Sequence, residues 1–247
     1  MSETSGQGGR TVESRLLHWQ NKVGSDVNTA EGKPFGKRKS PLGVHVVGLA
    51  GCTALLIVSK KGFYMAHYWE NIAFNLDEGM IPEVFESQEE AFQETVLDGL
   101  KEGFKGWPAR GTKAEQVSLT ELANDIDDPD IHAFLVIPAT GQSTDEAEGE
   151  PDPYRTYWDR IKDEVGKIIT RLDPNTPAGL ARWTEYPYAP VQKSEEVPGQ
   201  IQLLFRSTRG RVLFKYDPKH RRADGTRTKK TLVIIENEIK QEASWEW

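Results

Sequence analysis

The segment GVHVVGLAGCTALLIVSKKGFYMAHYW, residues 43–69, decides the fold. It contains three runs rich in β-branched and aromatic residues, separated by breaks that contain glycine, a pattern typical of consecutive β-strands. In the second run, apolar residues fill both alternating sets, because Ala54 and Leu56 fall on one face and Leu55 and Ile57 on the other. Strands that are apolar on both faces are covered on both sides. The segment therefore predicts the middle of a sheet rather than its edge.

The second and third runs are close enough in sequence to form a hairpin. If Val58 pairs with Phe63, then His67 lies opposite Ala54 and diagonally across from Cys52, on the same face of the sheet. Diagonal neighbours of this kind have Cβ atoms about 7–8 Å apart, a gap that a thiol and an imidazole can close. A three-residue loop would instead shift the pairing by one residue and put the two side chains on opposite faces.

The remaining elements alternate irregularly between helix and strand. Ser87 and Glu90 have the spacing of a capping box, and an apolar residue every fourth position then predicts a helix that ends near Gly106. Asp152 begins a second helical pattern. Further strands are predicted at HAFLVIP (132–138), ARWTEY (181–186), GQIQLLFRS (199–207), RVLFKY (211–216) and KTLVIIENEI (230–239). This order predicts an α+β fold, a mainly antiparallel β-sandwich core flanked by two or more helices.

Composition suggests how the chain is divided. Residues 1–40 are rich in Gly, Ser, Lys and Glu, which predicts a disordered N-terminal arm. Residues 41–247 are expected to form a single domain. An acidic stretch near 140–152, without a large apolar residue, is expected to be a solvated loop within it.

Charge and hydropathy exclude several classes of partner. The net charge of −7 is opposite to that of most nucleic-acid-binding domains, so no nucleic-acid partner is expected. No apolar run approaches the roughly 20 residues that span a bilayer, so no membrane insertion is expected. The N-terminal MSETSGQGGRTVESR lacks the apolar core of a secretory signal, which predicts an intracellular, cytoplasmic protein.

Cys52 is the only cysteine, so it cannot form an internal disulfide or a multi-thiolate zinc site. Gly48 and Gly51 allow the chain to turn sharply just before it and leave backbone N–H groups outside the sheet. A thiol beside such donors has two parts of an acyl-transfer site, a nucleophile and a donor for the developing oxyanion. His67 is then the candidate base. No pair of histidines stands at metal-ligand spacing, so neither a metal nor another cofactor is expected.

The segment HVVGLAGC with a histidine 15 residues after the cysteine resembles the glutamine-deamidase domains of bacterial cytotoxic necrotizing factor and Burkholderia lethal factor, and more distantly the chemoreceptor deamidase CheD. The resemblance covers residues 43–70. It implies a β-sandwich in which Cys52 is the nucleophile and His67 the base. The lethal factor and CheD orient this histidine with a threonine at the position of Val46, whereas the necrotizing factor uses a backbone carbonyl, a role the resemblance gives to the carbonyl of Val46.

The resulting hypothesis is a cysteine–histidine protein glutamine deamidase, an amidohydrolase that acts through a thioester on an exposed glutamine of a partner protein. Candidate oxyanion or substrate-binding residues are Leu49, Gly51, His45 and Trp69.

Two other hypotheses stay open. One is a catalytically inactive protein-binding module on the same sandwich. The other is a cysteine peptidase in which Asn71 or Asp77 orients the histidine. The basic cluster KHRRADGTRTKK (219–230) would suit an acidic partner or phosphate, but a solvated hairpin tip is the simpler interpretation.

Overall fold

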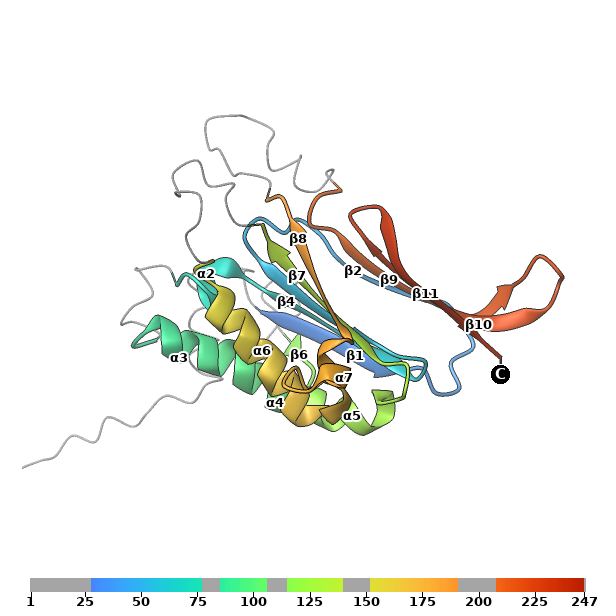
Figure 1. The fold of residues 1–247 in the computed structure, drawn as a ribbon, viewed down its shortest axis with the longest axis horizontal. Coiled ribbons are helices and arrows are strands. Elements are labelled where there is room, and N and C mark those ends of the chain that lie inside the picture. The colour runs from blue at the N-terminus through green and yellow to red at the C-terminus, as the bar shows by residue number, and fades with distance from the viewer. Residues whose placement is uncertain (1–27, 77–84, 106–114, 140–151, 191–207, 247) are drawn as a thin grey trace, which may run out of the picture.

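A computed structural model describes residues 28–76, 85–105, 115–139, 152–190 and 208–246. These residues form two β-sheets that face each other, with a layer of helices on the far side of the larger sheet (Figure 1). The predicted α+β sandwich is confirmed. None of the helices in the described ranges is long and apolar enough to cross a membrane.

The larger sheet has seven strands in the order β5-β6-β1-β4-β3-β7-β8. Most neighbours are antiparallel, and the pairs β1–β6 and β7–β8 are parallel. In chain order its strands are β1 (Thr29–Pro34), β3 (Thr53–Val58), β4 (Gly62–Tyr68), β5 (Phe104–Lys105), β6 (Glu115–Gln116), β7 (His132–Pro138) and β8 (Trp183–Tyr188).

The smaller sheet has four antiparallel strands in the order β11-β10-β9-β2. These strands are β2 (Leu42–Val46), β9 (Val212–Arg221), β10 (Arg227–Ile235) and β11 (Glu238–Trp245). The chain thus enters the larger sheet with β1, crosses to the smaller sheet with β2, and returns with β3. The turn between β2 and β3 contains the Gly-Leu-Ala-Gly-Cys segment and joins the two layers of the sandwich.

The helical layer covers the outer face of the larger sheet. It comprises α2 (Glu70–Ala73), the continuous helix α3 (Gln88–Phe92), η2 (Gln93–Asp98, π-helical) and α4 (Gly99–Glu102), then α5 (Leu119–Ile126), α6 (Arg155–Ile168), η3 (Thr170–Leu172) and α7 (Pro177–Leu180). The Ser87 hydroxyl accepts a hydrogen bond from the Glu90 amide at 3.1 Å, as the capping-box pattern predicts. This helix ends at Glu102, and Gly103 follows with φ of 78°, so the end lies slightly before the predicted Gly106.

Two hydrophobic cores lie on opposite faces of the larger sheet. The one beneath the helices is built from alternate strand residues such as Leu55, Ile57 and Tyr64, together with helical residues such as Trp158. The one between the sheets takes the other set, including Ala54, Leu56, Val58, Phe63 and Met65, and joins it to Phe214 and Val233 of the smaller sheet. All six residues of β3 are buried, as expected for a strand covered on both sides.

Two sequence-based predictions need correction, and others fall outside the described residues. Residues 29–34, assigned to the disordered arm, form β1 in the larger sheet, because β4 pairs with them along their length. The run KTLVIIENEI is not one strand: Glu236 and Asn237 have φ of 51° and 79° and turn the chain between β10 and β11. Residues 1–27, the strand predicted at 199–207 and most of the acidic stretch lie outside the described ranges. The basic cluster forms the connection between β9 and β10, the predicted hairpin tip.

Candidate active site

Cys52 lies at the end of the turn that leads into β3. Gly48 and Gly51 adopt φ of 73° and 103°, values that favour glycine, and so allow the chain to reverse between the two sheets. Cys52 directly precedes the first residue of β3 and belongs to the core between the sheets. Its side chain is 5% exposed, so the thiol is buried in this state.

The hairpin has the register that places Cys52 and His67 on one face. Val58 pairs with Phe63 and Ala54 pairs with His67. The Ser59 amide donates to the Gly62 carbonyl at 3.0 Å, which keeps the turn short and prevents the one-residue shift. Ala54 of β3 and Phe63 and Met65 of β4 belong to the core between the sheets. Cys52 lies two residues before Ala54 and His67 two residues after Met65, so each falls on the same face of its strand. Both candidate residues therefore face the smaller sheet.

His67 has a neutral imidazole set in a mostly apolar environment. Burial lowers its pKa from 6.5 to about 4. Its Nε2 is buried and makes no hydrogen bond in the part of the chain that the structure describes, and the residue as a whole is half-buried. The ring stacks on Trp69 with centroids 5.1 Å apart, and Thr29 of β1 lies opposite on the other neighbouring strand. A neutral imidazole with an unused nitrogen is able to accept a proton.

The Gly51 amide, predicted to be an open oxyanion donor, is already in use. It donates to the Tyr188 hydroxyl at 2.9 Å, and the same hydroxyl donates to the Cys52 carbonyl at 2.7 Å. Tyr188 is fully buried at the end of β8, and burial, followed by the nearby Cys52, raises its pKa well above the usual range. The phenol thus stays protonated and closes the turn around Cys52 from the side. The expectation of an unoccupied donor at Gly51 is wrong for this state.

A second set of contacts holds the same turn from the helical layer. The Glu70 carboxylate lies against the Cα of Gly51, in the space that a β-carbon would occupy, and accepts a hydrogen bond from the Tyr154 hydroxyl at 2.8 Å. Trp158 of α6 donates through its indole nitrogen to the Thr53 hydroxyl at 3.0 Å. The contacts of Tyr188, Glu70 and Tyr154 around this turn were not predicted from the sequence, because they join segments far apart in the chain.

The other predicted site residues lie on two sides of the same region. Val46 is buried on β2 and belongs to the core between the sheets, and Leu49 is fully buried in the turn. Among the described residues, no hydrogen bond joins the His67 side chain to the Val46 carbonyl, so the orienting role of that carbonyl stays a prediction. His45 is exposed on β2, and Trp69 donates its amide to the Asn28 side chain at 2.8 Å.

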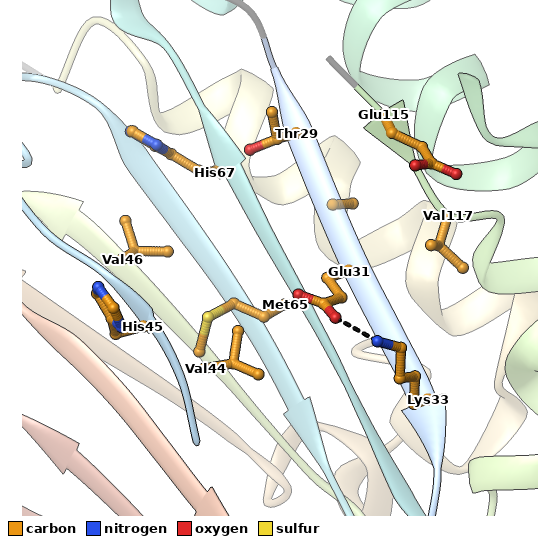
Figure 2. A pocket seen from close by; sticks show the side chains of 11 residues that line it. Thr29, Glu31, Lys33, Val44, His45, Val46, Met65, His67, Glu115 and Val117 are labelled. Atoms are coloured by element: carbon orange, nitrogen blue, oxygen red, sulfur yellow. Dashed lines mark hydrogen bonds and ion pairs between the residues drawn. The ribbon is translucent and has the colours of Figure 1, made fainter. Parts of the chain in front are cut away.

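A groove of about 390 Å³ runs beside this site, between the edge of the smaller sheet and the face of the larger one. Figure 2 shows its walls: Val44, His45 and Val46 from β2 on one side, Met65 and His67 from β4 along its floor, and Thr29, Glu31 and Lys33 from β1 beyond them. Glu115 and Val117 complete the far side. Within the described ranges, Cys52 does not line the groove, whereas His67 lies between the groove and the core that contains the thiol.

The described residues contain no group of three or more His, Cys, Asp or Glu side chains placed to hold a metal ion.

Comparison with known proteins gives little similarity. No protein-family model matches the chain, and no curated protein matches its sequence. Among solved structures, the C-terminal domain of CNFy from Yersinia pseudotuberculosis is similar with a TM-score of 0.33 and 10% sequence identity, over 90% of this chain. The chain spans 60% of the length of that domain's chain. At this level the similarity decides neither fold nor activity.

Proposed function

We propose that the protein is a cysteine-dependent glutamine deamidase in which Cys52 is the nucleophile and His67 the general base. The observation that carries the proposal is the β3–β4 register, since pairing of Ala54 with His67 puts the imidazole diagonally across from Cys52 on a shared face. Geometry rather than the pKa carries the role: burial keeps the His67 imidazole neutral, the form that accepts a proton, but its lowered pKa also makes it a weaker base.

The reaction would proceed in two stages. His67 takes the thiol proton, and the Cys52 sulfur attacks the carbon of a glutamine carboxamide. The C–N bond then breaks, ammonia leaves with the proton that His67 returns, and a thioester remains on the sulfur. In the second stage His67 takes a proton from water, the resulting hydroxide attacks the thioester, and the thiol is restored as the substrate leaves with glutamate in place of glutamine.

The buried state of the thiol defines what turnover requires. Cys52 is 5% exposed and the Gly51 amide is bonded to Tyr188. For Gly51 to stabilise an oxyanion, the Tyr188 hydroxyl must move away from it, and the turn must open toward the groove. We therefore expect the described state to be the closed form of the site, which a substrate carboxamide entering past His67 opens.

The test is deamidation of candidate proteins, followed by peptide mass spectrometry and ammonia release. Conversion of glutamine to glutamate should occur with the wild type and be lost in both Cys52→Ser and His67→Ala. His220→Ala is the matched control, because His220 lies on β9 and does not line the groove, and it should retain activity. Activity of Cys52→Ser equal to wild type would exclude the mechanism. The acid limb of kcat/KM should lie near the pKa of His67, about 4, so activity should persist below pH 6.5.

The burial of Cys52 and the use of the Gly51 amide favour a second candidate, a protein-binding module without catalysis. In that case iodoacetamide should alkylate Cys52 no faster than an unperturbed thiol, and partner binding should be unchanged in Cys52→Ser. Rapid alkylation at neutral pH together with glutamine conversion would favour the enzyme instead.

A further inference from the structure

Within the described part of the chain, strand β2 has one edge without a neighbouring strand. It is the last strand of the smaller sheet and pairs with β9 alone among the described strands. Three consecutive residues of β2, from Val44 to Val46, line the groove. Because successive side chains of a strand point to opposite faces, a pocket touched by consecutive residues runs along the strand's edge. The groove therefore follows the N–H and C=O groups that a further strand would pair with.

The two sheets differ in width, which leaves a floor beside this edge. The larger sheet extends past β4 to β1, β6 and β5, whereas the smaller sheet stops at β2. On β1 the face toward the helices is buried at Ala30 and Gly32, while Glu31 and Lys33 on the groove side are exposed. Glu31 and Lys33 form an ion pair at 2.6 Å, so the floor is polar and locally balanced in charge (Figure 2). One additional strand beside β2 would cover it.

We propose that this groove binds an extended segment of a partner protein, which pairs with β2 as a fifth strand of the smaller sheet. Main-chain hydrogen bonds to β2 would supply affinity independent of sequence, and alternate side chains would point down onto β1 and β4. The volume of about 390 Å³ lies within the range of roughly 300–1,000 Å³ typical of ligand pockets. One inward side chain would lie at His67, which lines the groove on the side of Cys52.

The chemistry of His67 selects that side chain. Its imidazole is neutral, and its Nε2 is buried without a hydrogen-bond partner among the described residues. A carboxamide both donates and accepts, so it satisfies this nitrogen in either tautomer, whereas a carboxylate only accepts and an ammonium only donates. Amide and hydroxyl side chains match this nitrogen, and among them we propose an inward glutamine as the occupant. The choice of glutamine rests on the proposed deamidase function, but pairing along β2 does not.

The test uses the full chain with Cys52→Ser, which prevents turnover, and a phage-displayed library of extended peptides of about ten residues with a central glutamine. The N–H groups of adjacent residues in a strand point to opposite edges. One of the two variants Val44→Pro and His45→Pro therefore breaks a hydrogen bond to β9, and the other removes only an N–H that faces the groove. The variant with the higher Tm is the test protein. Ala243→Pro and Ser244→Pro, chosen in the same way on β11 at the opposite edge, give the matched control.

The enriched peptides should bind at least about tenfold more weakly to the β2 variant and unchanged to the β11 variant. They should also slow amide hydrogen exchange in residues 43–46 and not in 241–245, a readout that remains decisive if both β2 variants unfold. Failure to enrich any peptide, equal binding to the β2 variant, or exchange protection elsewhere would overturn the proposal. So would dimerisation of the chain through β2, detected by sedimentation, because a second copy would then be the occupant.

The two proposals can fail separately. If peptides slow amide hydrogen exchange in β2 but the wild type never deamidates them, the docking surface stands and the proposed deamidase function is excluded. If the wild type deamidates a protein that binds the β2 variant as tightly as it binds the wild type, the proposed deamidase function stands and the docking surface on β2 is excluded.

Discussion

Tyr188 is the residue on which the closed state of the site depends. One hydroxyl accepts from the Gly51 amide and donates to the Cys52 carbonyl, and it does so from β8, more than a hundred residues further along the chain. Since both groups are buried, removing the hydroxyl leaves a donor and an acceptor without partners.

We expect Tyr188→Phe to lower the free energy of unfolding by about 1–3 kcal/mol and to make the turn more mobile. Urea denaturation measures the first effect. The rate of Cys52 alkylation by iodoacetamide measures the second and should rise. Tyr186→Phe is the control, because that hydroxyl bonds Glu236 at 3.2 Å in a partly exposed position, and its stability change should stay within about 0.5 kcal/mol. Unchanged alkylation in Tyr188→Phe would show that the hydroxyl does not hold the turn closed.

His67 links stability to pH. Its pKa is about 4 in the folded protein and 6.5 in the absence of burial, so the unfolded chain binds the proton more readily. Between these pH values the unfolded state carries more protons, and stability is lost as the pH falls through this window, by up to about 3 kcal/mol. Above pH 6.5 the contribution is constant.

We predict that His67→Gln flattens the stability profile between pH 6.5 and 4, measured by urea denaturation at several pH values. Met65→Leu, a volume-conserving change in the same groove that removes no titratable group, should keep the wild-type slope. An identical slope in His67→Gln and wild type would mean that the imidazole is solvated in the folded protein.

At the scale of elements, the turn before Cys52 is packed too closely to accept a side chain at residue 51. Gly51 has φ of 103°, and a β-carbon there would overlap the Glu70 carboxylate that begins α2. Gly51→Ala should therefore combine backbone strain with displacement of the Glu70 carboxylate from its bond to Tyr154, and cost about 2–3 kcal/mol. Gly225→Ala is the matched control: φ is 86° and nothing lies near, so only the strain of about 1–2 kcal/mol is expected.

Adding Glu70→Ala to Gly51→Ala separates these two costs, since the clash disappears and the strain remains. Chemical denaturation of Gly51→Ala, Glu70→Ala, the double variant and Gly225→Ala should show the double variant closer to Gly225→Ala than to Gly51→Ala. Strictly additive losses would indicate that Glu70 and the turn do not touch.

The sequence was sufficient for elements whose residues carry a strong periodic pattern. The β3–β4 hairpin was predictable from its two apolar runs and short break, whereas its register was not, because both faces are apolar and a one-residue shift would still bury apolar residues. The strand β1 was not, because TAEGKP contains a glycine, a proline and little apolar surface. It is a strand only because β4 pairs with it, and Gly32 lies so close to Leu122 of α5 that a side chain would not fit. Its strand character comes from tertiary contacts.

The candidate site divides in the same way. The β3–β4 register puts Cys52 and His67 on one face, one of the two alternatives that the sequence left open. The groove was not predictable, because it arises from the unequal widths of two sheets. The occupied Gly51 amide was not predictable either, because its partner comes from β8. The turn at Glu236 and Asn237 was missed because apolar residues flank it closely, although Asn is a residue that tolerates positive φ.

At the scale of the whole molecule, the sandwich depends on how its two sheets are joined. Phe35 lies in the connection between β1 and β2, is 4% exposed, and stacks on Tyr216 of β9 with ring centroids 3.9 Å apart. Phe214 and Trp245 flank the same ring at 6.1 and 6.5 Å. Its backbone amide also donates to the Lys61 carbonyl, in the hairpin of the larger sheet, at 2.6 Å. One residue thus contacts both sheets.

Phe35→Ala should lower the free energy of unfolding by about 3–5 kcal/mol, the range for deleting a buried aromatic ring. Ile239→Ala, at a side chain 59% exposed, should change it by no more than about 0.5 kcal/mol. Thermal unfolding followed by both far- and near-ultraviolet circular dichroism decides whether the sheets are one cooperative unit. If they are, the transitions stay coincident and shift together to lower temperature. Two separate transitions in Phe35→Ala would mean that the smaller sheet can detach. The groove along β2 would then be only as stable as the aromatic contact that keeps this strand above the floor formed by β1 and β4.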